Sequence, residues 1–262
     1  MQRAYGASSF RTSLDRFVAA QPDGLAVVEH EGAVVGTGCC VAYSSGGFGW
    51  IGLVATAPGF ERRGIATAIT SLLGDVLAGH GCAAVLDASA AGGPVYERMG
   101  FTDCGLTRVM GFDGRDAGAI TSPERCAPLG AAELDEVVAF DSLRFGASRS
   151  VLLRRVVEQN PGRALLLRSG PEIVGYLVAQ DTTLAPIVAD DQESLSCLVS
   201  AALRLGWQSA PRINVPPESK HIESLSALGF ALRRELRHMR RGIGTLPGRR
   251  DCVAGLVSLG EG

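Results

Sequence analysis

Hydrophobic and polar positions along the first hundred residues predict short strands interleaved with helices. Strands are expected over 25–30, 33–43 and 50–56, a helix over 13–20 and a turn over 44–49. A longer helix is expected from Gly64 to Ala78, because large apolar residues recur there at helical spacing, at positions 65, 69, 72, 73, 76 and 77. A strand over 82–88, a short helix over 94–99 and a strand over 101–110 complete this half.

The second half of the chain repeats the order of the first. The stretch MGFTDCGLTRVM at 99–110 matches LGFALRRELRHM at 228–239, and EGAVVGTGCCVA at 31–42 matches GPEIVGYLVAQ at 170–180. Two copies of one fold explain this pattern best. A linker rich in Gly, Asp, Pro and Ser separates them, so we expect one domain over 1–117 and a second over 118–262. Each copy is expected to be α/β, with a mixed and mostly antiparallel sheet flanked by helices.

Charge and composition exclude several classes of protein. A formal net charge of -2 gives no overall basic field, so we expect no nucleic-acid partner. The segment 32–60 is uncharged and long enough to cross a bilayer, but its glycines, the polar break at 44–47 and Pro58 predict strands and a turn, so no membrane partner is expected. The first fifteen residues lack the apolar core of a signal peptide, which favours a cytoplasmic protein.

Seven cysteines are scattered through the chain without the spacing of a metal site or a disulfide framework. Cys39 and Cys40 lie in an apolar run and are interpreted as buried thiols. We therefore expect neither a structural disulfide nor a bound metal.

The stretch GFERRGIATAI at 59–69 places two arginines and a glycine at the start of the longer helix. The first N–H groups of a helix have no partner within it, Gly64 permits close approach of the backbone to a ligand, and Ala66 keeps the next position small. Together these features form a cradle for a phosphate or pyrophosphate, although a solvated basic helix end is an equally good interpretation of this stretch alone.

A second motif, YERMGF at 96–101, lies about thirty residues after the first. A glycine-rich loop comes directly before it. With ERRGIA at 61–66, this motif resembles the signature of the GNAT superfamily of acyl-CoA-dependent N-acetyltransferases, a loop of the type [QR]xxGx[GA] followed by YExxGF. The resemblance covers residues 25–112. It implies that acetyl-CoA (coenzyme A) is the cofactor, with its pyrophosphate on the N–H groups of 62–67 and its pantetheine arm along 54–56. The cofactor-binding residues implied in this way are Val54, Ala55, Thr56, Arg62, Arg63, Gly64, Ile65, Ala66, Thr67 and Ser89.

Tyr96 is the catalytic candidate. The resemblance implies a general-acid tyrosine at this position, and a phenol can share or donate a proton to a departing thiolate. The alternative is an aromatic ring that only packs the short helix onto the sheet. No Asp or Glu lies between Trp50 and Pro58, where many family members carry a base, and Asp87 is expected to satisfy loop N–H groups at a strand end.

Three features depart from the family pattern. Glu61 replaces the usual Gln or Arg and puts a carboxylate near the expected pyrophosphate. Ser89 stands where many members have an asparagine that touches the pantetheine arm. We also expect the first strand of the fold to be missing, because the chain starts near a helix.

The second copy has VADDQESLSCL at 188–198 where the first has its cradle, and Leu225 in place of the tyrosine. It is therefore expected to be a degenerate, non-catalytic GNAT-like domain. Five arginines at 233, 234, 237, 240 and 241 are interpreted as solvated, with Leu232, Leu236 and Met239 making the apolar contacts.

The resemblance as a whole implies an N-acetyltransferase that moves an acetyl group from acetyl-CoA to the amine of a small molecule by direct attack. The acceptor is expected to be a metabolite, an amino-acid derivative or an antibiotic. A non-catalytic acyl-CoA-binding or regulatory module and a scaffold without a cofactor site remain alternatives. The sequence does not indicate an oligomeric state.

Overall fold

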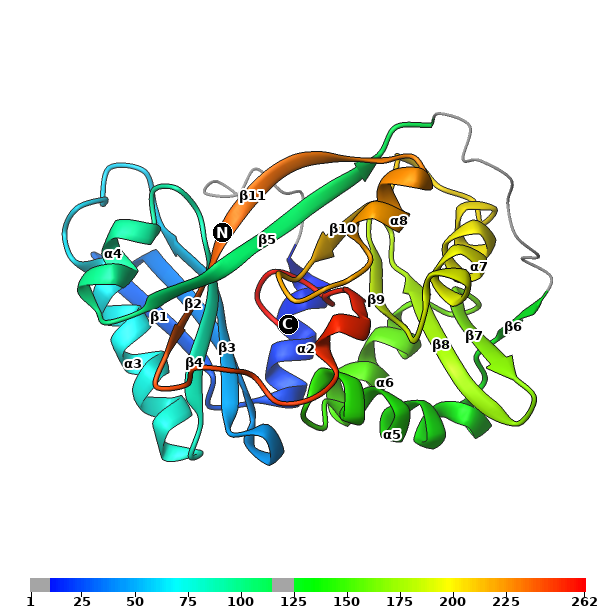
Figure 1. Ribbon diagram of the computed structural model, residues 1–262. Coiled ribbons are helices and arrows are strands. Elements are labelled where there is room, and N and C mark those ends of the chain that lie inside the picture. Colours follow the sequence, from blue (N-terminus) through cyan, green and yellow to red (C-terminus); the bar gives the residue numbers. More distant parts are fainter. Residues whose placement is uncertain (1–9, 115–124) are drawn as a thin grey trace. The chain divides into compact units, whose positions relative to one another are not determined.

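The computed structural model describes residues 10–114 and 125–262, and these residues form two compact units (Figure 1). The first unit contains the described residues up to Gly105, together with Arg237–Leu246 and Leu259–Gly262. The second contains Leu106–Leu236 and Pro247–Ser258. Each unit thus includes a segment from the other half of the sequence. The two units are defined by contacts between residues, whereas the expected domain limits of 1–117 and 118–262 come from the sequence repeat. Those limits therefore stay a prediction.

Most elements of the first unit lie where the pattern of apolar residues predicts them. They are helix α2 (Arg11–Ala20), strands β1 (Leu25–His30) and β2 (Ala33–Tyr43), the 3-10 turn η1 (Ser44–Gly46), strand β3 (Phe48–Thr56), helix α3 (Ile65–Gly79), strand β4 (Ala83–Ala88) and helix α4 (Gly93–Arg98). Strands β1, β2 and β3 pair antiparallel, whereas β3 and β4 pair in parallel. The expected missing first strand concerns residues that lie outside the described part of the chain.

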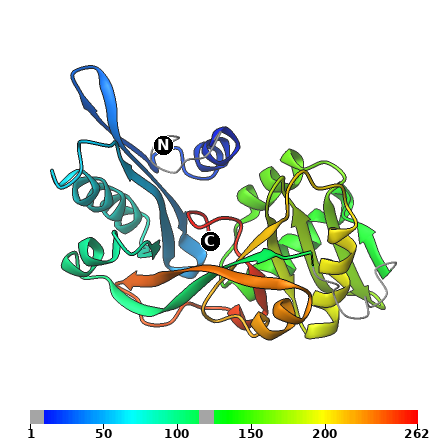
Figure 2. The same cartoon turned by 90° about the horizontal axis from the view of Figure 1, so that it is seen from above.

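Helix α3 packs closely on one face of this sheet because glycines remove the side chains beneath it. A Cβ at Gly38 would lie 2.4 Å from Ile69, and one at Gly49 would lie 2.3 Å from Leu77. Ile69, Leu73 and Leu77 are buried against the strands in one continuous core. Figures 1 and 2 place α3 and α4 on the same face of the sheet and α2 on the opposite face.

The last residues of the chain belong to the first unit and pack near α2. Glu261 is fully buried and pairs with Arg16, with 2.7 Å between Oε1 and Nε. Gly260 contacts Gly52 of β3 so closely that a Cβ on Gly52 would lie 2.1 Å from its Cα. The pair connects the end of the chain to α2, and the cost of desolvating both charges offsets much of the attraction between them.

The second unit holds a five-stranded sheet in the order β12-β9-β8-β7-β6. Its elements are β6 (Cys126–Pro128), η3 (Ala131–Glu133), α5 (Leu134–Phe145), α6 (Ser150–Gln159), β7 (Ala164–Ser169), β8 (Glu172–Ala179), β9 (Leu184–Ala189), α7 (Gln192–Leu203), β10 (Arg212–Val215), α8 (Ile222–Ala227), η4 (Arg250–Cys252) and β12 (Val253–Gly255). A buried core of aliphatic residues joins α7 to the strands. The two sheets with flanking helices confirm the predicted α/β class.

Two long strands, which are the equivalent strands of the sequence repeat, are shared between the units. Strand β5 (Thr102–Phe112) pairs antiparallel with β10, and β11 (Phe230–Arg241) pairs antiparallel with β4. The larger sheet therefore runs β1-β2-β3-β4-β11-β5-β10. The strand beside β4 in the first unit is consequently supplied by the second half of the sequence.

All seven cysteines are free, and Cys39 and Cys40 are buried as expected. Burial raises the pKa of both thiols to about 12. In the part of the chain that the structure describes, no helix has both the length and the apolar character needed to span a bilayer.

Candidate functional site

The loop that follows β3 leads into α3 with two residues in the left-handed region. Arg62 has φ of 60° and Gly64 has φ of 80°. The first hydrogen bond of the helix joins the N–H of Ala68 to the carbonyl of Gly64 at 2.9 Å. Among the described residues, the N–H groups of 64–67 have no hydrogen-bond partner. The helix start therefore presents backbone donors to a ligand, and the helix dipole favours a negative charge there.

Space for such a ligand exists at Gly64. A Cβ built on this residue meets no atom within 4 Å, so the residue needs glycine for its positive φ and not for packing. Open space beside free N–H donors is what a pyrophosphate requires. The residues present at the start of α3 therefore fit the phosphate end of coenzyme A.

The charged side chains of this loop have different surroundings. The carboxylate of Glu61 accepts a hydrogen bond from the N–H of Gly59, with 2.7 Å between Oε2 and N, so its charge is engaged within the loop. Arg62 and Arg63 are exposed, and the Arg63 guanidinium lies 4.9 Å from the centre of the Phe60 ring. Both arginines are placed to add positive charge near the open N–H groups.

Strands β3 and β4 diverge beside the helix start. They pair only through Phe48–Trp50 and Ala83–Val85, so the remainder of β3 runs without β4 as a neighbour. The register between β2 and β3 shifts near Leu53, which has φ of 53°, as in a β-bulge. The N–H of Ala57 donates to Val35 of β2 at 2.8 Å, so the backbone groups of Thr56 face the opposite edge, toward the gap. An extended ligand could add to β3 there.

Tyr96 lies on α4 with its ring partly buried against the core of the first unit. Its ring makes an edge contact with Phe101, with 5.9 Å between the ring centres. A Cβ on Gly92 would lie 2.9 Å from Cε2 of Tyr96, so a glycine is needed beside the ring. Burial raises the pKa of Tyr96, and the neighbouring Thr70 of α3 opposes this shift. The phenol is therefore protonated at neutral pH and can act as an acid.

Ser89 connects the end of β4 to α4. Its hydroxyl oxygen accepts from the N–H of Gly92 at 3.2 Å, and its carbonyl accepts from the N–H of Gly93 at 2.9 Å. A hydroxyl retains a donor and a second lone pair after accepting one bond. The predicted contact between Ser89 and the pantetheine arm remains compatible with this role and stays a prediction.

Asp87 was expected from the sequence to accept hydrogen bonds from loop N–H groups through its carboxylate, but its observed partner is a different group. Its carboxylate binds His238 of β11, with 3.0 Å between Oδ1 and Nδ1, and both side chains are fully buried. The Nε of Arg240 donates to the Nε2 of His238 at 3.2 Å, so the His238 Nδ1 carries the proton that is donated to Asp87. A carboxylate tied in this way is a structural group and offers no free base.

The arginines of β11 are not solvated as a group, contrary to the interpretation from sequence. Arg233 pairs with Asp113, Arg237 pairs with Glu97 and Asp103, and Arg240 is buried. Leu232, by contrast, is 52% exposed. The strand exchange explains the error, because it surrounds β11 with acidic and aromatic groups that are distant in the sequence.

The corresponding helix start in the second copy is already capped. The side chain of Asp191 accepts from the N–H of Ser194 at 2.7 Å, and Glu193 lies in the first turn of α7. Leu225 of α8, which replaces the tyrosine, is fully buried. Acidic side chains thus take the place that an anionic ligand would need, in agreement with a degenerate copy.

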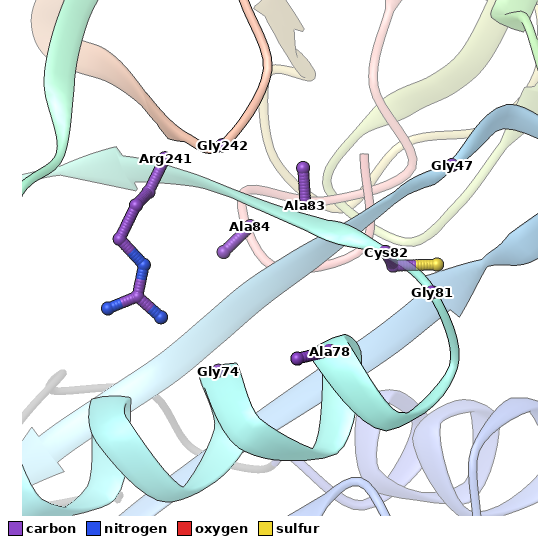
Figure 3. Close-up of a pocket in the computed structure, with 9 residues that line it drawn as sticks. All are labelled: Gly47, Gly74, Ala78, Gly81, Cys82, Ala83, Ala84, Arg241 and Gly242. Atoms are coloured by element: carbon purple, nitrogen blue, oxygen red, sulfur yellow. The ribbon is translucent and has the colours of Figure 1, made fainter.

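A separate hollow of about 370 Å³ lies at the other end of α3, and its lining includes Gly74, Ala78, Cys82 and Arg241 (Figure 3). Its lining includes neither Tyr96 nor any of the residues 64–67 that carry the open N–H groups. The candidate site is instead the gap between β3 and β4, with the start of α3 on one side and α4 following the end of β4.

Comparison with known protein families decides the classification. An acetyltransferase (GNAT) family model matches residues 2–101, and a second model, described as an acetyltransferase (GNAT) domain, matches residues 137–255. The chain belongs to the GNAT acetyltransferases. The two matches follow one another along the sequence, so the protein is a tandem GNAT, as the repeat predicted. No curated protein matches the chain.

Solved structures agree with this fold. "A Putative Acetyltransferase" from Pyrococcus horikoshii has a TM-score of 0.86 at 23% identity, covering all of this chain and 89% of its own. A tandem GNAT protein from the clavulanic acid biosynthesis pathway has a TM-score of 0.57 at 17% identity, covering 89% of each chain. A GCN5-related N-acetyltransferase from Anabaena variabilis has a TM-score of 0.60 at 15% identity, covering 92% of this GNAT chain and 68% of its own.

The structure places the predicted site residues in one unit: 54–56 on β3, 62–67 at the start of α3, Ser89 after β4 and Tyr96 on α4. Their roles toward a ligand stay predictions. Sequence reasoning missed Thr70, which lies beside Tyr96, and the contacts that β11 makes with α4. The spacing of Thr70, three residues after Thr67 on the helix, is the signal that could have found it.

Proposed function

We propose that this tandem GNAT is an N-acetyltransferase that moves an acetyl group from acetyl-CoA to an amine of a small molecule by direct attack. The observation that carries the proposal is the start of α3, where the N–H groups of 64–67 have no hydrogen-bond partner among the described residues and the left-handed Gly64 has open space beside it. The family membership supports acetyl transfer, and the capped helix start of the second copy supports a single site.

Acetyl-CoA, when bound, supplies an activated acetyl thioester. In this proposal the N–H groups of 64–67 hold its pyrophosphate, with Arg62 and Arg63 adding charge. The open edge of β3 at Val54–Thr56 holds the pantetheine arm, and Ser89 contributes a hydrogen bond. Backbone N–H groups at this edge would also stabilise the oxyanion that develops as an amine attacks.

Tyr96 holds a proton at its phenol oxygen and delivers it to the sulfur that departs. In the reaction the new bond would join the amine nitrogen to the acetyl carbon as the carbon–sulfur bond breaks. The proton lost by the amine would pass to water, and the Tyr96 phenolate would regain a proton from water. Asp87 takes no part, since its carboxylate binds the buried His238. A neutral phenol matches this role, because its proton stays bound at physiological pH.

A continuous assay of free thiol tests the proposal, with acetyl-CoA and a panel of primary amines as substrates. We expect turnover with at least one amine, and Tyr96→Phe should lower kcat by about 10² to 10⁴ while leaving acetyl-CoA affinity nearly unchanged. Unchanged turnover in this variant would reduce Tyr96 to a packing residue. Binding of acetyl-CoA without turnover of any amine would favour the alternative, a non-catalytic acyl-CoA-binding module.

A further inference from the structure

The helix that carries Tyr96 depends on contacts from outside itself. Helix α4 spans only Gly93–Arg98, six residues, whereas isolated helices shorter than about 12–15 residues are marginal in water. The position of the phenol is therefore set by the groups that touch α4.

Arg237 of β11 contacts α4 at both ends. Its Nη2 donates to Oε1 of Glu97 at 2.6 Å, and its Nε donates to Oδ1 of Asp103 at 2.8 Å. Its guanidinium also lies against the first residue of the helix, since a Cβ on Gly93 would be 2.6 Å from Nη1. One side chain thus spans α4 from Gly93 to Glu97.

Arg241 of β11 holds the ring on which Tyr96 rests. Its Cζ lies 5.0 Å from the centre of the Phe101 ring, and Nη1 donates to the carbonyl of Met99 at 3.4 Å. Gly74 makes room for it in the middle of α3, because a Cβ there would lie 2.3 Å from Nη2. Figure 3 shows Arg241 reaching from the strand toward this helix.

The two arginines act on one face of the sheet. Arg237 is paired in register with Ala88 and Arg241 with Ala84, and residues four apart on a strand point to the same side. Met239, between them, is buried in the core formed with α3. The face of β11 that holds 237, 239 and 241 is therefore the face that carries α3 and α4.

We propose that Arg237 and Arg241, supplied by the last long strand of the second half, are positioning residues for Tyr96 of the first half. Arg237 fixes the axis of α4, and Arg241 fixes the Phe101 ring against which the phenol packs. The second copy then serves catalysis by completing the first, although its own helix start is capped. This inference rests on the proposed role of Tyr96 as the acid.

Three variants separate positioning from folding. Arg237→Gln removes the charged contacts to α4. Gly74→Ala displaces the Arg241 guanidinium while replacing glycine with a better helix former, so it should not weaken α3. Arg233→Gln is the matched control, because Arg233 lies four residues earlier on the same strand, pairs with Asp113 and packs on Gly111, yet has no contact with α4 among its described partners.

Two readouts are needed. The first is the NMR signal of ring-labelled tyrosine, titrated with pH, with the Tyr96 signal assigned by its loss in Tyr96→Phe and the buried Tyr43 as an internal reference. The second is kcat and the KM for acetyl-CoA with the best amine. Thermal unfolding of each variant shows whether the fold is retained.

We expect Arg237→Gln and Gly74→Ala to shift or broaden the Tyr96 signal and to change the pH at which it titrates, and to reduce kcat by roughly 10- to 100-fold with little change in KM. Arg233→Gln should behave as the unmodified protein. An unchanged Tyr96 signal and pKa in both test variants, or equal effects in Arg233→Gln, would overturn the inference. The NMR result does not need turnover, so a protein without activity would sink the proposed function while the positioning of Tyr96 is still decided.

Discussion

The buried pair of Asp87 and His238 gives a sharp prediction about how β11 is held in the first unit. Both side chains are 0% exposed, and Arg240, which donates to His238, is 5% exposed. Substituting Asp87→Ala removes the carboxylate that accepts a hydrogen bond from His238, which in turn accepts from Arg240. The variant therefore leaves the buried Nδ1–H of His238 without the carboxylate that accepts from it, together with a small cavity.

The expected magnitude follows from this burial. Leaving a buried hydrogen-bond donor without its acceptor costs about 1–3 kcal/mol, and more where the lost partner is charged, because the donor stays desolvated. Asp103→Ala is the matched control, since its carboxylate also pairs with an arginine of β11 but is 49% exposed. Such an exposed pair contributes about 0–1 kcal/mol.

The chain supplies a local probe for the measurement. Its two tryptophans are Trp50, whose ring lies 5.4 Å from that of His238, and Trp207 in the second unit. Urea unfolding followed by fluorescence in a Trp207→Phe background reports on the first unit alone. A free energy of unfolding that falls no further in Asp87→Ala than in Asp103→Ala would refute the reasoning.

Two further predictions concern the acid and the second copy. Burial raises the pKa of Tyr96 above the ordinary value of 10.0, so the protonated phenol and its contribution to kcat persist at and below pH 10 and are lost only as pH rises through the higher folded value. A pH profile of kcat checks this expectation. A decline at high pH that disappears in Tyr96→Phe assigns the titrating group to Tyr96. Asp191→Ala removes the cap of α7 and should lower the stability of the second unit by about 1 kcal/mol, measured by Trp207 fluorescence. It should not create a second acetyl-CoA site, because Glu193 remains in the first turn, and two sites in calorimetry would contradict this.

Local elements were predictable because local chemistry determines them. Strands β1 and β2 have the predicted limits, since alternating apolar residues are interrupted only by the turn at Glu31 and Gly32. The start of α3 was expected one residue from its observed position, because Gly64 is the residue that the left-handed entry requires. These signals act within a few residues and do not depend on the rest of the fold.

Long-range partners were not predictable in the same way. The repeat identified β5 and β11 as equivalent strands, but no residue in either strand indicates that β11 pairs with β4. The arginines of β11 were therefore assigned to solvent, and Asp87 was assigned to loop N–H groups. Glu61 is the converse case, where a local bond to Gly59 removes a conflict that the sequence pattern had suggested.

The most direct test of the central claim is calorimetric titration of acetyl-CoA into the unmodified protein and two glycine variants. Gly64→Glu places a carboxylate among the N–H donors of α3. Gly32→Glu is its control, because Gly32 also has a positive φ, 75°, and open space around its Cβ position, but lies in the turn between β1 and β2. We predict binding at one site that is lost in Gly64→Glu and retained in Gly32→Glu. Absence of binding in the unmodified protein, or equal binding in both variants, would contradict the account.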